Sequence, residues 1–222
     1  MLEAINRSDL MNRDFEVRQL LRAYRSGLMS EAAFEEEMAQ LEHEASSPEA
    51  QRQPAPGFEA FGQLFRTERE AVLNFLDKLH ATQMDAAVGF AKWAAVCRTN
   101  GLRAGLMIIA ERDASHARAL ERRARELGGE LHSTATEQGN KLVELMANKE
   151  IADIEKLVAL TSLIQDPREA VAPLVDFAQL LKKDMETKQA LRLIAEDELS
   201  SGGWLRDVCE ALASRAATPG SS

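Results

Sequence analysis

The chain has 222 residues, of which 45% are hydrophobic and 28% charged, and its net charge is −9. This balance is typical of a folded globular protein, and the negative charge argues against nucleic acid as a partner, because neutralising phosphates requires a basic surface. No uncharged run reaches the roughly 20 residues that cross a bilayer, and the N-terminus lacks the apolar core of a secretory signal, so we expect a cytoplasmic protein with no membrane attachment. Gly and Pro are few, at 12 and 6, and strong helix formers are abundant, which predicts an all-α fold.

Residues 14–42 form two short runs in which apolar side chains recur at helical spacing. The first run contains Leu20, Leu21, Tyr24 and Leu28, and the second contains Phe34, Met38 and Leu41. Gly27 suits the C-terminal cap of the first helix, and Ser30 suits the N-terminal cap of the second. We therefore predict a helical hairpin within residues 1–45, which is similar to the short SHOCT-type hairpins of bacterial proteins. Because it is too small to fold firmly alone, it is expected to dock on the main domain, on a second copy or on a protein partner.

A proline-rich linker at 46–57 leads to four long apolar-periodic segments, at about 58–97, 102–127, 137–163 and 174–200. A break in the first segment near Leu79 is left open. Gly202 and Gly203 are expected to end the fourth segment before a short fifth helix. Segments of this length suit a four-helix bundle, predicted at 58–214, with a disordered tail at 215–222. The segment "GGELHSTATEQGN" between the second and third helices is long enough to cross the bundle, although its length does not decide the topology.

Two stretches carry a family resemblance. "LHATQMDAAVGFAKWAAVCRTNGLRAGLMIIAERDASHARALERRARELGG" resembles the first two core helices of the ferritin-like superfamily, in which a Glu on the first helix is followed by E-x-x-H on the second. "DMETKQALRLIAEDELSSGGWL" resembles the last core helix of bacterioferritins. The resemblance covers about residues 80–205 and implies a ferritin-like bundle that holds metal ions between its helices.

Compared with the family pattern, the ligand set of this chain is reduced. Gln83 stands where the resemblance places the Glu of the first helix, and Asp113 with His116 gives D-x-x-H in place of E-x-x-H. Glu198 matches the Glu of the last helix, but Ser201 stands in place of the second histidine. The carboxylate of the third helix is left open between Glu150, Asp153 and Glu155. The resemblance therefore implies a metal site of Asp113, His116 and Glu198, with Gln83 as a neutral contact, that holds at most one iron or other divalent ion.

Two functions remain open from the sequence. The first is a homo-oligomeric ferritin-like protein that weakly binds or oxidises ferrous iron. The second is a metal-free helical bundle that acts as a structural or interaction module, in which Asp113 and His116 are an internal hydrogen-bonded pair. His43, His80 and His132 have no ligand partners at convincing spacing, and Cys97 and Cys209 are expected to be buried apolar groups. No nucleophilic triad, phosphate loop or dinucleotide fingerprint occurs.

Overall fold

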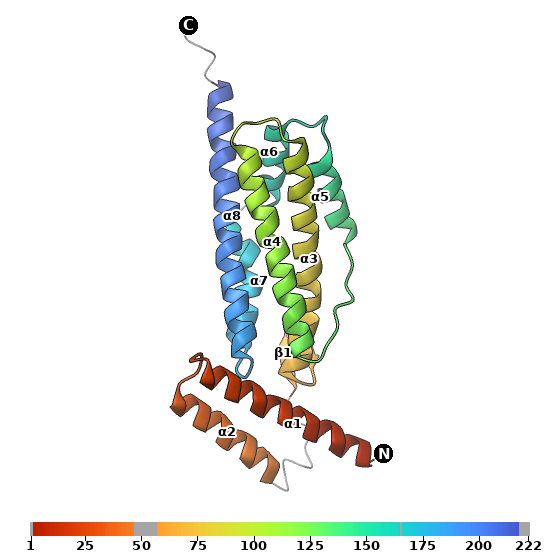
Figure 1. Ribbon diagram of the computed structural model, residues 1–222, viewed down its shortest axis with the longest axis vertical. Coiled ribbons are helices and arrows are strands. Elements are labelled where there is room, and N and C mark those ends of the chain that lie inside the picture. The colour runs from red at the N-terminus through yellow and green to blue at the C-terminus, as the bar shows by residue number, and fades with distance from the viewer. Residues whose placement is uncertain (1, 47–56, 165, 218–222) are drawn as a thin grey trace. The chain divides into compact units, whose positions relative to one another are not determined.

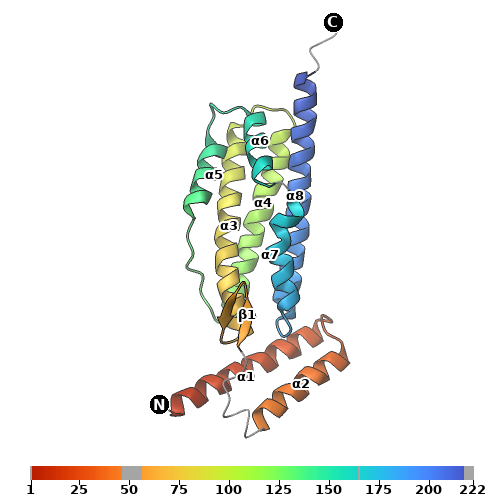
Figure 2. The same cartoon turned by 180° about the vertical axis from the view of Figure 1, so that it is seen from behind.

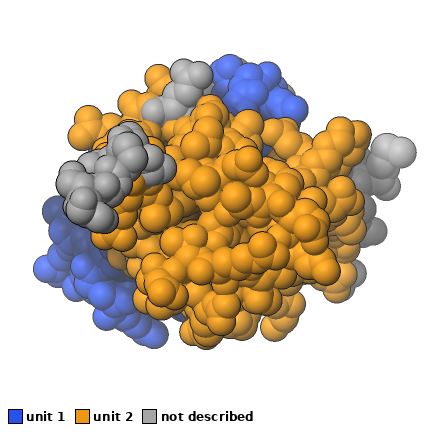
Figure 3. Space-filling model, turned by 90° about the horizontal axis from the view of Figure 1, so that it is seen from above, with its two compact units in different colours: residues 1–72, 175–192 blue, residues 73–174, 193–222 orange. Residues whose placement is uncertain are grey.

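The computed structural model describes residues 2–46, 57–164 and 166–217. Within these residues it is all-α, with eight helices and one two-stranded antiparallel sheet (Figure 1). The helices are α1 (Leu2–Arg25), α2 (Glu31–Ser46), α3 (Glu68–Val96), α4 (Leu102–Glu126), α5 (Glu137–Ala147), α6 (Asp153–Leu163), α7 (Pro167–Leu180) and α8 (Met185–Ala217). The chain divides into two compact units, residues 1–72 with 175–192 and residues 73–174 with 193–222 (Figure 3). Within the described ranges, no helix is both long enough and apolar enough to cross a bilayer.

The first unit contains the expected N-terminal hairpin, formed by α1 and α2. Gly27 adopts a φ of 74°, and the N–H of Leu28 returns to the carbonyl of Ala23, which closes α1. The Ser30 hydroxyl accepts the N–H of Ala33 and opens α2. The predicted linker lies almost entirely outside the described residues, as does the tail beyond Ala217.

A short β-hairpin, β1 (Phe58–Ala60) and β2 (Gln63–Phe65), replaces the helix that we expected to begin at Phe58. Its two turn residues, Phe61 and Gly62, both have positive φ, at 53° and 69°. Two positive φ values suit the primed turns whose twist matches paired strands. The expectation of helix from Phe58 was wrong because the Phe58 and Phe61 rings pack on Phe177, which outweighs the apolar spacing, and α3 begins only at Glu68.

A carboxylate holds the loop between α7 and α8 in the first unit. Glu68 accepts the backbone N–H groups of Lys182, Lys183 and Asp184 at 2.7–3.0 Å. Burial raises the pKa of Glu68, although these three N–H donors oppose the rise. Two residues of α1 form ion pairs with this part of the chain. Glu16 pairs with Lys183 at 3.2 Å, and Arg22 pairs with Glu186 at 3.1 Å. The hairpin is thereby attached to the start of α8.

In the second unit, α3, α4 and α8 run side by side, with α5 on the outer side of α3 (Figures 1 and 2). The chain leaves α4, returns along α3 through residues 127–136 and α5, and then enters α6 in the same direction as α4 (Figure 2). Asp77 on α3 secures this return by accepting the N–H groups of His132 and Ser133 and the Ser133 hydroxyl at 2.6–2.9 Å. The long connection is therefore a crossover.

The expected third helix, 137–163, is instead two helices separated by residues 148–152. Residues 167–173, which lie between the expected third and fourth segments, form the first half of α7. Asp166 caps that helix by accepting the N–H of Arg168 at 2.8 Å, and Pro167 occupies the first helical position, where a missing N–H costs nothing. Pro173 lies inside α7 on an exposed side, so water can reach the carbonyl group that loses its bond. The two prolines therefore do not exclude a helix here.

Helix α8 continues through Gly202 and Gly203 to Ala217, so the predicted helix end and separate fifth helix were wrong. Side-chain packing explains the continuation. Leu205 is buried, and the Trp204 ring lies against Gly105 of α4, where an added Cβ would come within 2.1 Å of a ring carbon. Tertiary contact thus offsets the low helix propensity of the two glycines.

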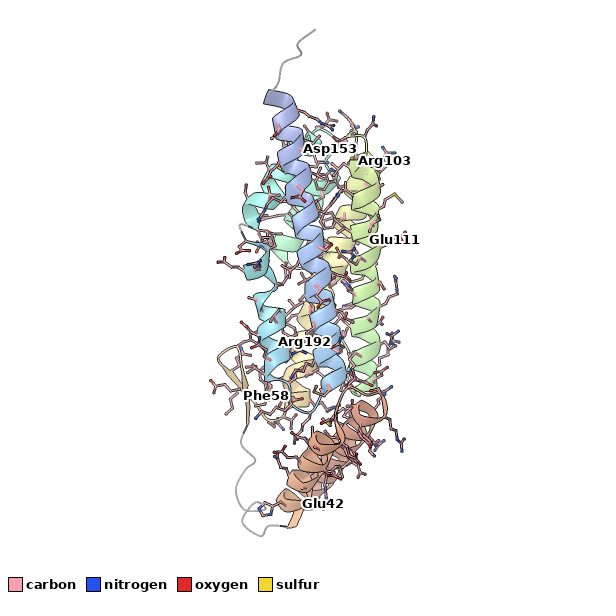
Figure 4. The ribbon with its side chains drawn as sticks, turned by 90° about the vertical axis from the view of Figure 1, so that its left-hand side faces the viewer. Glu42, Phe58, Arg103, Glu111, Asp153 and Arg192 are labelled. Carbon is pink, nitrogen blue, oxygen red and sulfur yellow. The ribbon has the colours of Figure 1, made fainter. Side chains whose placement is uncertain are left out.

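The α3–α4 turn is fastened by Asp153, the first residue of α6. Its carboxylate accepts the indole N–H of the fully buried Trp93 at 2.8 Å, the N–H groups of Arg98 and Thr99, and the Thr99 hydroxyl at 2.7 Å. These donors lower the pKa of Asp153 to about 2 in spite of its burial. Figure 4 shows Asp153 at the same end of the helices as Arg103, which follows this turn.

We expect Asp153→Asn to destabilise the protein by roughly 2 kcal/mol at pH 7, because an amide cannot accept all of these hydrogen bonds. A folded pKa of about 2 lies below the ordinary 3.8, so this contribution is present above pH 4 and is lost as the pH falls towards 2. Urea unfolding at pH 7 and pH 3 measures both effects. Asp207→Asn on the exposed side of α8 is the control, and equal stability of the two variants at pH 7 would contradict the assignment.

The two helical glycines 105 and 203 should respond in opposite ways to alanine. At Gly203 nothing lies within 4 Å of an added Cβ, so Gly203→Ala should raise the unfolding free energy by up to about 1 kcal/mol. At Gly105 the added carbon meets the Trp204 ring, so Gly105→Ala should lower it. Thermal unfolding of the two variants separates the effect of side-chain packing from that of helix propensity. If both substitutions raised the stability, the Trp204 ring would have to move aside freely.

Candidate functional site

Three helices of the second unit bring the four predicted site residues together. Gln83 lies on α3, Asp113 and His116 lie one turn apart on α4, and Glu198 lies on α8. One ligand atom each of Asp113, His116 and Glu198 lie within 4.8 Å of one another. The sequence spacing of three on α4 explains why the carboxyl and the imidazole project from the same face.

Gln83 bridges two of these groups in the interior. Its side-chain nitrogen donates to Glu198 Oε1 at 2.9 Å, and its oxygen lies 3.1 Å from His116 Nδ1. A carboxylate can only accept, so the amide must turn its nitrogen to Glu198 and its oxygen to the imidazole. Only 4% of Gln83 is exposed, so this orientation is held in a dry environment.

His116 is held from its other side by Asp197. Its Nε2 lies 3.0 Å from Asp197 Oδ2, while the other oxygen of that carboxylate lies 3.7 Å from Arg112 Nε. Arg112 also donates to the backbone carbonyl of Asp197 and to the hydroxyl of Ser201, at 3.1 and 3.0 Å. Both imidazole nitrogens therefore face side-chain oxygens, Gln83 Oε1 on one side and Asp197 Oδ2 on the other.

The Asp113 carboxyl group lies in an environment that disfavours its charged form. It is 1% exposed, and its Oδ1 is buried without a hydrogen-bond partner. Burial raises the pKa of Asp113 to about 8, and the negative charges of Glu198 and Asp197 add to the rise, against the opposing charge of Arg112. The expected hydrogen-bonded pair of Asp113 and His116 is not formed, because the imidazole uses both nitrogens on Gln83 and Asp197.

The other residues considered from the sequence lie elsewhere. Glu150 is exposed, Asp153 serves the α3–α4 turn, and Glu155 accepts the N–H of Ala152, so none of the three candidate carboxylates joins the site. Ser201 is buried beside Arg112. His80 Nδ1 is the second buried side-chain atom without a partner within the described residues, but the cluster around Asp113 does not include it.

Sequence reasoning missed Arg112 and Asp197. Each is adjacent to a predicted ligand, and spacing along one helix does not show which neighbour points inwards. One sequence feature could have indicated Asp197. It lies four residues before Ser201, a spacing that places both side chains on one face of α8 beside Glu198. Arg112 contacts both of them.

Comparison of this chain with protein-family models, with curated proteins and with solved structures finds no match.

We expect Asp113→Asn to make the metal-free protein more stable at pH 8. A folded pKa of about 8 lies above the ordinary 3.8, so stability falls as the pH rises from about 4 to 8, and a neutral amide removes this loss. The gain at pH 8 should be a few kcal/mol, because each tenfold change in a proton-binding equilibrium corresponds to about 1.4 kcal/mol, and it should nearly vanish below pH 4. Urea unfolding in a chelator measures it.

The matched control is Glu111→Gln, on the same helix but with the carboxylate exposed to solvent (Figure 4). That variant should unfold with nearly unchanged free energy at both pH values. If Asp113→Asn were less stable than the unsubstituted protein at pH 8, the Asp113 carboxylate would not be an unfavourable group in the fold.

Proposed function

We propose that the second unit binds one divalent metal ion between Asp113, His116 and Glu198, as a ferritin-like bundle with a reduced site. The observation that carries the proposal is the buried Oδ1 of Asp113, which lacks a partner beside a second carboxylate. Burying such a group without compensation is costly, and a cation among the three side chains would compensate it.

The chemistry of the three side chains suits a transition metal of charge two. Two carboxylates and a neutral imidazole balance the charge of one divalent ion, which lowers the cost of holding it beside the buried Asp113. Mixed oxygen and nitrogen donors favour ferrous iron, Mn²⁺ or Zn²⁺ over Mg²⁺ and Ca²⁺, which prefer oxygen alone. We therefore propose ferrous iron or a related divalent ion as the ligand.

The separation between two of the proposed ligand atoms supports a shared ion. His116 Nδ1 lies 4.0 Å from Glu198 Oε1. Two ligands that each lie about 2.1 Å from one ion are about 3 Å apart at a right angle and about 4 Å apart when opposite. Asp197 would keep its bond to His116 Nε2 and so orient the ring, as carboxylates commonly do behind metal-bound histidines.

Two features favour one ion over two. Where the resemblance places a second histidine, Ser201 accepts a hydrogen bond from Arg112. The guanidinium is permanently charged and would repel a second cation at that position.

The crossover between α4 and α6, which returns the chain along α3, supports a ferritin-like connection order for the bundle.

A metal-free structural module is the alternative, and one observation favours it. Gln83, His116, Glu198 and Asp197 already form a continuous set of hydrogen bonds across α3, α4 and α8. Such a set can fix the helices without an ion. In that case the α1–α2 hairpin would serve as the docking module, for a second copy or another protein.

The test is titration of the full chain with MnCl₂, and anaerobically with ferrous sulfate, followed by calorimetry. We expect one ion per chain, and a loss of affinity of about tenfold or more in Asp113→Asn and in His116→Ala. His132→Asn, which alters an exposed histidine, is the control and should bind normally. Failure of the unsubstituted protein to bind, or equal binding by all three variants, favours the metal-free module.

A further inference from the structure

We infer that Gln83 sets the charge of the ion that the site accepts, so that the site prefers divalent to trivalent metal ions. This inference rests on the proposed function, because it concerns the ligand of the same site. It assigns a specificity-determining role to a residue that carries no charge.

Gln83 is placed to act on the ion directly. Its amide oxygen lies 3.1 Å from His116 Nδ1, the ring nitrogen that is 4.0 Å from Glu198 Oε1, and its amide nitrogen donates to Glu198 at 2.9 Å. The residue is 4% exposed, so water contributes little screening at this position. Any charge placed on this side chain would be felt strongly by the ion and by both carboxylates.

The count of charges gives the preference. Asp113 and Glu198 together supply two negative charges. Asp197, the acidic side chain that contacts His116, is not counted, because Arg112 lies 3.7 Å from it and offsets its charge. A divalent ion is therefore balanced, whereas a trivalent ion would leave one positive charge uncompensated in the interior. A carboxylate at position 83 would supply the missing charge.

Gln83 also limits the repulsion between the carboxylates when no ion is bound. A ligand oxygen of Asp113 and one of Glu198 lie within 4.8 Å of each other. The amide donates to one carboxylate and adds no charge of its own, whereas a glutamate would add repulsion and lose the donor. The residue thus makes a divalent site compatible with a folded metal-free protein.

The experiment compares a divalent and a trivalent ion that do not change oxidation state, Zn²⁺ and Ga³⁺, in competition with nitrilotriacetate. The full chain, Gln83→Glu, and Gln138→Glu as a control are titrated, since Gln138 is exposed on α5. We expect the ratio of Ga³⁺ to Zn²⁺ affinity to rise at least about tenfold in Gln83→Glu and to stay unchanged in Gln138→Glu.

A second variant keeps the inference testable if Gln83→Glu does not fold. Glu198→Gln removes one charge, so the same ratio should fall, since the trivalent ion loses more than the divalent one. A ratio that stays constant in either folded variant while Zn²⁺ still binds overturns the role of Gln83 and leaves the proposed function intact. Absence of Zn²⁺ binding to the unsubstituted chain overturns both.

Discussion

The site is organised around one constraint, which is that the Asp113 carboxyl group is buried on α4 with an oxygen that no donor reaches. A helix core tolerates a polar group when its hydrogen bonds are satisfied, and the surrounding residues achieve this for Gln83, His116 and Asp197 but not for Asp113. Within this network, the missing hydrogen bond is that of one buried atom, Asp113 Oδ1. Groups of this kind lower stability and are retained in proteins mainly where they interact with something else.

The fold places this group through features that lie far from it along the chain. The crossover of residues 127–136 and α5 allows α4 and α8 to lie side by side, and the uninterrupted course of α8 carries Glu198 and Ser201 on one rigid element. Arg112 then joins α4 to α8 by contacts with Asp197 and Ser201. The site is consequently built on helices whose positions are fixed at several points, which is the arrangement that holds ligand geometry most accurately.

The sequence predicted the helical class and named four side chains that the structure brings together, because helical spacing at 113 and 116 is a local property and the resemblance supplied positions 83 and 198. It failed where tertiary contacts outweigh local preference. Gly202 and Gly203 signalled a helix end, yet the packing of Trp204 and Leu205 continues α8. Phe58 looked helical, yet the turn at Phe61 and Gly62 forms a hairpin. The roles of Arg112 and Asp197 depend on which helices are neighbours, and a single sequence does not contain that information.

The packing of Trp204 on Gly105 has a consequence for how this protein can change over evolution. The indole occupies the space that any side chain at position 105 would need, so neither position is free to vary alone. Among descendants of this chain, a larger residue at 105 should appear together with a smaller one at 204, and a retained tryptophan should accompany a retained glycine. Because Glu198 lies on the same helix as Trp204, this pair also constrains the position of Glu198.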